Sequence, residues 1–328
     1  MKIKVVKFIV HGYHVSGKGE KMDFLQEINE KYPVRKTEKQ KAEFRQYVVE
    51  TVCEKGAEAR VETIGNHNNV VIGDPQTAKT VFTAHYDTPC ASLFPNLMMP
   101  RNKGLFYLYQ FVIIFLFLAL SLTPAIIVGM NILQSEIAYV GIFLVIYFGL
   151  FFLGFKTFTN KHNANDNTSG VATVLLIICK LSKEQLNNVA FILFDNEEKG
   201  LQGAKAYSKA HKEQMQDKLL VNFDCVANGN NVIFIAKQKA EENPYYKALK
   251  ESFVSNEEFN VSFNAFKDSV SNSDYKKFEQ GVCCVACKKS KKGILYTPYI
   301  HTGKDVVADS KNVEFLALNI YKFVDKIV

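Results

Sequence analysis

Two adjacent glutamates follow an apolar run in the middle of the chain. The run at 189–194 is followed directly by Asp195, Asn196, Glu197 and Glu198. Neighbouring carboxylates raise each other's pKa unless a positive charge lies near them. A bound metal ion would supply that charge, so the pair indicates a metal site at the end of a buried strand.

Further potential metal ligands lie at similar places in the sequence. They are His85 and Asp87 after the run TVFTA, Asp166 before a predicted helix, Asp224 after the run LLVNF, and His301 near the C-terminus. Imidazole and carboxylate ligands suit zinc in a catalytic site, and manganese or cobalt could replace it. The carboxylates outnumber the needs of one ion, which predicts two ions about 3.5 to 4 Å apart. His85 and Asp87 face the same side of a strand, so Asp87 could accept the second imidazole N–H.

The segments between these residues alternate between strand and helix patterns. Apolar runs predict strands at 59–64, 68–73, 79–87, 188–194, 218–226, 231–236 and 281–287, and helical spacing predicts helices at 23–56, 167–183, 200–214 and 312–328. This alternation predicts an α/β fold with a mixed, largely parallel central sheet flanked by helices. In such sheets ligands bind beyond the carboxyl ends of the strands, where the potential metal ligands lie.

A long uncharged stretch interrupts this alternation. Between Gly104 and Phe155 the only charged residue is Glu136, which lies between apolar runs at 105–130 and 137–155. Each run is near the roughly 20 residues that a helix needs to cross a bilayer core. We therefore predict a transmembrane helix hairpin in which Pro124 kinks or ends the first helix. The alternatives are a hairpin buried in a soluble protein and an apolar lid used for dimerisation.

Charges beside the hairpin predict its orientation. Arg101 and Lys103 precede the first run and Lys156 and Lys161 follow the second, whereas the segment at 131–136 has no Lys or Arg. The positive-inside bias then places the catalytic domain in the cytoplasm. We expect residues 1–100 and 159–328 to form this α/β domain and residues 101–158 to form the inserted hairpin.

Composition and cysteine content indicate the class of protein, its compartment and its partners. With 48% hydrophobic and 22% charged residues, the 328-residue chain is not disordered overall. The N-terminus lacks a signal-peptide core, and seven cysteines, an odd number, suit a reducing compartment. Cys284 and Cys287 have the spacing of half a zinc or redox site, but without a second pair we expect them in a strand core. The net charge of +7 comes without a nucleic-acid-binding motif, so nucleic acid is not an expected partner, whereas the apolar hairpin makes the lipid bilayer one.

Five motifs resemble those of a known enzyme family. In chain order they are AHYDT, NANDNTSG, FDNEEKGLQGA, NFDCV and YIHTGKD. As a set they resemble the motifs of the co-catalytic di-zinc exopeptidases, metallopeptidase family twenty-eight, over about residues 40–90 and 160–328. The resemblance implies a mixed sheet between helices. The corresponding region between the first two motifs is short in soluble relatives, so the predicted hairpin is an insertion.

The resemblance also implies a role for each residue of the site. It implies one zinc held by His85 and Glu198, a second held by Asp224 and His301, and Asp166 as a bridge between them. Asp87 would orient His85, and Glu197 would be the general base toward a water whose pKa zinc lowers to about 7.

The expected activity is hydrolysis of the N-terminal peptide bond of a peptide substrate by a membrane-tethered aminopeptidase. One alternative keeps the site and changes the substrate, giving a zinc carboxypeptidase or N-acyl amino acid hydrolase. Another is a nonhydrolytic membrane scaffold. Three residues leave questions for the structure: Tyr275 stands where relatives often have His, His162 is expected in a loop near Asp166, and Tyr299 could bind the oxyanion or pack in the core.

Overall fold

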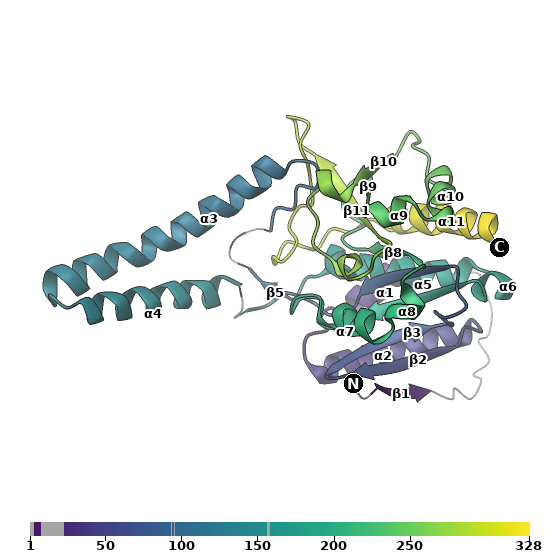
Figure 1. Ribbon diagram of the computed structural model, residues 1–328, viewed down its shortest axis with the longest axis horizontal. Coiled ribbons are helices and arrows are strands. Elements are labelled where there is room, and N and C mark those ends of the chain that lie inside the picture. Colours follow the sequence, from purple (N-terminus) through teal and green to yellow (C-terminus); the bar gives the residue numbers. More distant parts are fainter. Residues whose placement is uncertain (1–2, 8–22, 93, 95, 156–157) are drawn as a thin grey trace.

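A mixed sheet forms the centre of the molecule (Figure 1). The computed structural model describes residues 3–7, 23–92, 94, 96–155 and 158–328. In these residues the strands of the sheet lie in the order β1 (Ile3–Lys7), β2 (Ala59–Ile64), β3 (His67–Ile72), β7 (Val189–Phe194), β4 (Thr80–His85), β8 (Leu219–Phe223), β11 (Gly281–Lys289), β9 (Asn231–Ala236) and β10 (Asn260–Ala265), with β12 (Leu295–Tyr296) paired to β11.

Three parallel pairs of the described strands lie at the centre of this sheet, and another, β9 with β10, lies at its margin. β4 pairs in parallel with β7 on one side and β8 on the other, and β8 pairs in parallel with β11. Antiparallel pairs join β1, β2, β3 and β7 at one margin and β9 to β11 near the other. The carboxyl ends of β7, β4 and β8 therefore meet at one edge. The predicted mixed sheet flanked by helices is confirmed.

Helices cover both faces of the sheet. Successive residues of β7 pack into two different hydrophobic clusters, because side chains alternate between the faces of a strand. Helices of the first cluster are α1 (Phe24–Lys31), α2 (Glu38–Glu54), α5 (Ser169–Lys180), α9 (Gln238–Glu241), α10 (Pro244–Ser252) and α11 (Ser310–Ile327); those of the second are α7 (Gln202–Ala210), α8 (Lys212–Met215) and η4 (Asp274–Lys277). Short helices α6 (Lys183–Leu186) and η3 (Phe266–Asp268) complete the domain. The edge of the sheet at which the carboxyl ends of β7, β4 and β8 meet is thus supported by hydrophobic packing on both faces.

Local sequence explains where these helices begin and end. Thr37 and Gln40 form a capping box at the start of α2, and Gly56 follows its end with φ +80°. The prediction of one helix over 23–56 is wrong, because α1 ends before Pro33, which lacks an N–H and disfavours helical geometry in the residue before it. The segment predicted as one helix at 200–214 is also divided, into α7 and α8. The strands β1 and β10 and the helix α10 were not predicted.

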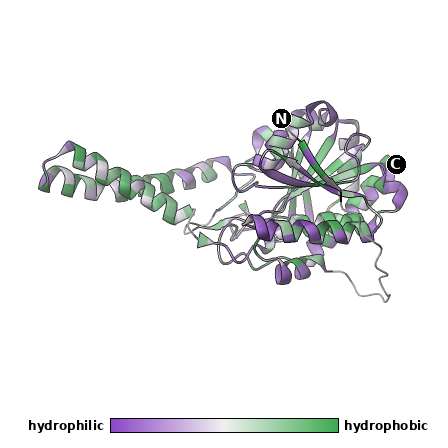
Figure 2. Cartoon of the chain, turned by 90° about the horizontal axis from the view of Figure 1, so that it is seen from below, coloured by the Kyte–Doolittle hydropathy of each residue, from purple (hydrophilic) through white to green (hydrophobic). Residues whose placement is uncertain are grey.

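Two apolar helices project from the α/β domain as a hairpin (Figures 1 and 2). α3 (Lys103–Pro124) continues as the π-helical η1 (Ala125–Ile132), and α4 (Glu136–Phe155) returns to the domain. The helix does not end at Pro124 but changes its hydrogen-bonding pattern there. Both helices are long and apolar enough to cross a membrane, and only 22% and 6% of their most apolar windows are buried. In the described residues the hairpin is therefore not buried against the rest of the chain.

The hairpin joins the domain through a small second sheet. β5 (Cys90–Ala91) before α3 pairs antiparallel with β6 (Phe158–Thr159) after α4. The pairing brings both connections to one place beside the end of β4. Lys156, one of the charges used to predict orientation, lies outside the described residues.

Candidate metal centre

Strand ends bring most of the predicted ligands together. His85 is the last residue of β4, Glu197 and Glu198 follow β7, and Asp224 follows β8. Because β4 lies between β7 and β8 and is parallel to both, these four side chains emerge at the same edge. Strand ends thus position three of the five predicted ligands, together with the predicted general base Glu197.

Loops supply the remaining two ligands, Asp166 and His301. Asp166 lies in η2 (Ala164–Thr168), just before α5, with non-helical φ −112° and ψ 96°. The main-chain N–H groups of Asn165 and Asp166 each donate to the Asp305 carboxylate at 3.0 Å. His301 lies in the same C-terminal loop as Asp305, with φ +59°. Asp305 therefore links the two loops that carry these ligands.

Asp305 was not selected from the sequence, although it lies within the motif YIHTGKD. The side chain is fully buried. Burial raises the pKa of Asp305 to about 7, against the opposing effect of the N–H groups of Asp166 and Asn165. Its position four residues after His301 was the only available signal.

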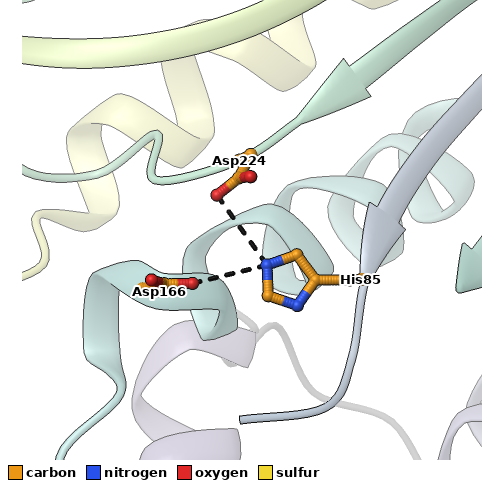
Figure 3. A group of neighbouring side chains, drawn as sticks. All are labelled: His85, Asp166 and Asp224. Atoms are coloured by element: carbon orange, nitrogen blue, oxygen red, sulfur yellow. Dashed lines mark ion pairs between the residues drawn. The ribbon is translucent and has the colours of Figure 1, made fainter. Parts of the chain in front are cut away.

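Asp166 lies between two groups of ligands. Its Oδ1 is 3.3 Å from His85 Nε2 and its Oδ2 is 3.1 Å from His301 Nε2. On the first side, His85 Nε2 is also 3.8 Å from Asp224 Oδ1, as Figure 3 shows. On the second side, His301 Nε2 is 3.4 Å from Glu198 Oε2. In each group of three, the ligand atoms lie within 4.8 Å of one another.

This grouping differs from the pairing that the family resemblance implied. His85 shares its group with Asp166 and Asp224, and His301 shares its group with Asp166 and Glu198. His85 also lies within the same distance of Glu197 and Glu198, but that group lacks the bridging residue. The correction arises because each oxygen of Asp166 faces a different histidine, which the order of motifs along the chain does not encode.

Asp87 contacts the main chain of the glutamate pair as well as the imidazole of His85. Its Oδ1 accepts the main-chain N–H of Glu197 at 2.9 Å, and its Oδ2 accepts that of Glu198 at 3.2 Å. His85 Nδ1 is 3.1 Å from the Asp87 main-chain oxygen and 3.6 Å from the carboxylate Oδ1. The predicted orientation of His85 by Asp87 is thus made mainly through the main-chain carbonyl.

The centre holds an excess of buried carboxylates over basic groups. Burial raises the pKa of Glu197 and of Glu198 well above the usual range, and each is raised further by neighbouring carboxylates. Burial acts to raise the pKa of Asp166 too, but hydrogen bonds to His301 and His85 lower it overall. Burial would lower the pKa of His85, yet Glu197 and the other carboxylates raise it. A cation bound among these groups would offset their negative charge.

The donor set fits a zinc site. Among the described residues, the buried Glu198 Oε1 has no hydrogen-bond partner. Buried polar atoms are nearly always hydrogen-bonded or bound to an ion. The three groups that could hold a metal contain histidine nitrogens and carboxylate oxygens without cysteine, which is the donor chemistry of catalytic zinc. A metal therefore accounts for an atom that the protein leaves unpaired.

A buried cation behind the centre had no signal in the sequence. Arg35 is fully buried, and its Nε donates to the Tyr86 main-chain oxygen at 2.5 Å. Its Nη2 donates to Thr168 Oγ1 at 3.2 Å. Burial lowers the pKa of Arg35 to about 10, while Asp87 and Asp166 act to raise it. Arg35 thus places a fixed positive charge near two of the acidic residues.

Another acidic residue that sequence reasoning missed is Asp274 of η4. It is fully buried, and neither of its carboxylate oxygens has a hydrogen-bond partner among the described residues. Burial raises its pKa well above the usual range; His85 opposes this, and Asp87 and Asp224 add to it. Its neighbour Tyr275 is fully buried and packs edge-on against Phe266.

Other residues noted in the sequence lie away from the metal ligands. His162 is exposed in a loop, as expected. Tyr299 is 43% exposed, so a core-packing role is wrong. Cys284 and Cys287 are buried in β11, as predicted.

A cavity of about 420 Å³ opens onto the centre. It is lined by the five predicted ligands and Glu197, together with residues of the loops around 96–100 and 270–272. The predicted general base and the predicted ligands therefore border one space in which a small substrate group can lie.

Comparisons with known proteins agree with this architecture. A model of peptidase family M28 matches residues 154–323. No curated protein sequence matches the chain. A solved aminopeptidase, LapA of Legionella pneumophila, has 14% identity and a TM-score of 0.53, with 93% of this chain and 68% of that chain covered.

Two further solved structures are similar over nearly their whole length. The glutaminyl cyclase of Porphyromonas gingivalis has 13% identity and a TM-score of 0.53, with 93% of this chain and 96% of that chain covered. A Zn-dependent exopeptidase from Parabacteroides distasonis has 14% identity and a TM-score of 0.53, with 92% and 95% covered. At these identities the likeness concerns the fold.

Proposed function

The chain belongs to peptidase family M28, and we propose that it is a membrane-tethered, zinc-dependent exopeptidase that acts as an aminopeptidase. The observation that carries the proposal is the pair of ligand groups that share Asp166, with Glu197 beside them. The buried Glu198 Oε1, which has no hydrogen-bond partner among the described residues, supports a bound cation at this place.

We propose two zinc ions. His85, Asp166 and Asp224 would hold one, and Asp166, Glu198 and His301 would hold the other. When bound, zinc supplies Lewis-acid polarisation of the scissile carbonyl and lowers the pKa of water to about 7. The two-sided contacts of Asp166 support its role as the bridge.

The side chain of Glu197 is proposed to move the proton. It borders the same cavity as the ligands, and its main-chain N–H is held by Asp87 at 2.9 Å. In this position Glu197 accepts a proton from the attacking water and returns it to the leaving amine. Asp87 keeps the carboxylate in place, and Asp305 holds the loop that carries Asp166.

The hairpin at 101–158 is proposed to be a transmembrane insertion in one catalytic domain made of residues 1–100 and 159–328. Support comes from the central sheet, in which β4 before the hairpin pairs with β7 and β8 after it. Further support comes from the large exposed apolar surface of α3 and α4, which water does not favour. The charges of Arg101, Lys103 and Lys161 beside the hairpin favour a cytoplasmic catalytic domain.

Substrate panels test the proposed activity. Full-length protein in lipid nanodiscs should release chromophore from free-amine aminoacyl anilides, lose this activity with a chelator, and regain it with zinc. Release only from N-blocked substrates would identify the carboxypeptidase or N-acyl amino acid hydrolase alternative. A nonhydrolytic scaffold would show no turnover and well under one zinc per chain, and this result would refute the proposal.

A further inference from the structure

A second cavity joins the metal centre to the hairpin. Its volume is about 680 Å³, and it shares Glu198, Lys199 and His301 with the cavity that holds Glu197. Its far side is formed by hairpin residues, namely Gln110, Ile113, Ile114 and Phe117 of α3 and Tyr147, Phe151 and Phe155 of α4. The hairpin is therefore part of the wall of a space that reaches the proposed ligands.

The shape of the hairpin creates this space. At the tip the helices touch, since a Cβ added to Gly129 would lie 2.4 Å from Tyr139 Cα. Toward the domain α3 and α4 diverge (Figure 1). Phe94 and Phe155, the last residue of α4, pack with Phe117 from the interior of α3, with ring centroids between 5.4 and 6.2 Å apart. The cavity lies between these diverging helices and the centre.

The chemistry of the hairpin side suits a hydrocarbon chain better than a peptide. Apart from Gln110 and Tyr147, the side chains that α3 and α4 contribute to the lining have no hydrogen-bonding group. A peptide segment placed there would leave main-chain N–H and C=O groups unpaired, which is unfavourable in an apolar space. A hydrocarbon chain has no such groups, and its burial is favourable.

We infer that the substrate carries a long hydrocarbon chain, which lies in the hairpin cavity while the scissile amide lies at the metal centre. The inference rests on the proposed hydrolytic function and specifies its substrate class. The chain is either the acyl group of an N-acyl amino acid or an alkyl group on the leaving amine of a free-amine substrate. In both cases water hydrolyses the amide: its oxygen forms a bond to the carbonyl carbon, the C–N bond breaks, and a proton carried by Glu197 goes to the departing amine, which gives a carboxylic acid and a free amine.

Two substrate series distinguish the sources of the chain. The full-length protein in nanodiscs, loaded with zinc, is assayed with N-acyl leucines and with leucine n-alkylamides of increasing chain length. We expect kcat/KM to rise by about tenfold or more from the short to the long members of one series, because each buried methylene adds binding free energy. A rise in the alkylamide series agrees with the proposed aminopeptidase, whereas a rise in the N-acyl series identifies the N-acyl amino acid hydrolase alternative.

A matched pair of variants separates the cavity from simple partitioning into lipid. Ile113→Trp fills the cavity, whereas Val145→Trp places the same ring on α4 at a 74% exposed position outside the lining. Partitioning acts equally on both variants, so only Ile113→Trp should lose the chain-length dependence while keeping turnover of short substrates. Ile114→Trp, at a 52% exposed position that also lines the cavity, repeats the test where bulk is better tolerated.

The results that would overturn the inference differ from those that would also overturn the proposed function. Turnover of short substrates with no chain-length dependence, or a dependence that is the same in all variants, would overturn the inference and leave the proposed function standing. Zinc-loaded protein that hydrolyses no member of either series, nor any aminoacyl anilide, would overturn both.

Discussion

Glu197 and Glu198 have different surroundings although they are adjacent. Glu198 Oε2 lies 3.4 Å from His301, and its other oxygen is unpaired among the described residues. Glu197 borders the catalytic cavity but does not belong to either of the groups that share Asp166. A single carboxylate, Asp87, holds both main-chain N–H groups. The two glutamates are thus held together in surroundings that suit the two different tasks proposed for them, metal binding for Glu198 and proton transfer for Glu197.

Substitution of each glutamate by glutamine should separate these tasks. Glu197→Gln should lower kcat by about 100-fold to 10,000-fold, because the amide cannot accept the proton, while zinc content is unchanged. Glu198→Gln should lose zinc, because a charged ligand is removed. Metal analysis and a chromogenic assay on both variants measure the two effects. If Glu197→Gln keeps its zinc and full turnover, the base assignment is wrong.

At the scale of elements, a buried ion pair ties the loop after β7 to α2. Lys41 Nζ lies 2.6 Å from Asp195 Oδ1, and both side chains are almost completely buried. Lys41 Nζ also lies 3.0 Å from Asn196 Oδ1, and Asp195 Oδ2 accepts the main-chain N–H of Asn68 at 2.9 Å. The loop that carries the glutamates is therefore held by a helix and by a neighbouring strand.

Asp195→Ala should destabilise the protein strongly. It removes the buried carboxylate 2.6 Å from the Lys41 ammonium and leaves only the exposed Glu38 at 3.7 Å, so the free energy of unfolding should fall by about 3 to 5 kcal/mol. The control is Glu27→Ala, which removes the partner of Lys31 in a solvent-exposed pair, where a much smaller loss is expected. Thermal unfolding followed by circular dichroism compares the two variants. Equal shifts in both would show that the buried pair does not stabilise the loop.

At the scale of the molecule, the largely hydrophobic hairpin projects from the α/β domain, in which hydrophobic and hydrophilic segments are mixed (Figure 2). α4 has 20 residues, which corresponds to about 30 Å of helix and matches the thickness of a bilayer core. Both connections of the hairpin leave the domain at the β5–β6 pair. A membrane around the hairpin would therefore place the second cavity between the bilayer surface and the metal centre.

The native protein should sediment with membranes and need detergent for release. Replacement of residues 103–155 by a short Gly-Ser linker should give a soluble protein, because β5 and β6 already hold the two ends together. That variant should keep zinc and turnover of short substrates. A reporter fused at Val328 tests orientation and should signal from the cytoplasm. Recovery of the native protein without detergent would refute the membrane proposal, and an external signal would reverse the orientation.

The sequence by itself determined the features that depend on nearby residues. Apolar runs predicted the strands that carry the site, uncharged length predicted the projecting helices, and residue types at strand ends predicted a metal centre of histidine and carboxylate groups. The wrong prediction of one helix over 23–56 also has a local cause, because Pro33 interrupts the helical pattern that surrounds it.

Only the tertiary structure decided how these parts meet. The placement of Arg35 and the support from Asp305 depend on contacts between residues 133 and 139 positions apart in the chain. The partition of ligands on either side of Asp166 depends on its contacts with His85 and His301. The cavity between the hairpin and the centre likewise forms only where α3 and α4 meet the α/β domain. Local patterns carry no information about such distances, because they arise from the order of strands in the sheet and the packing of loops across its edge.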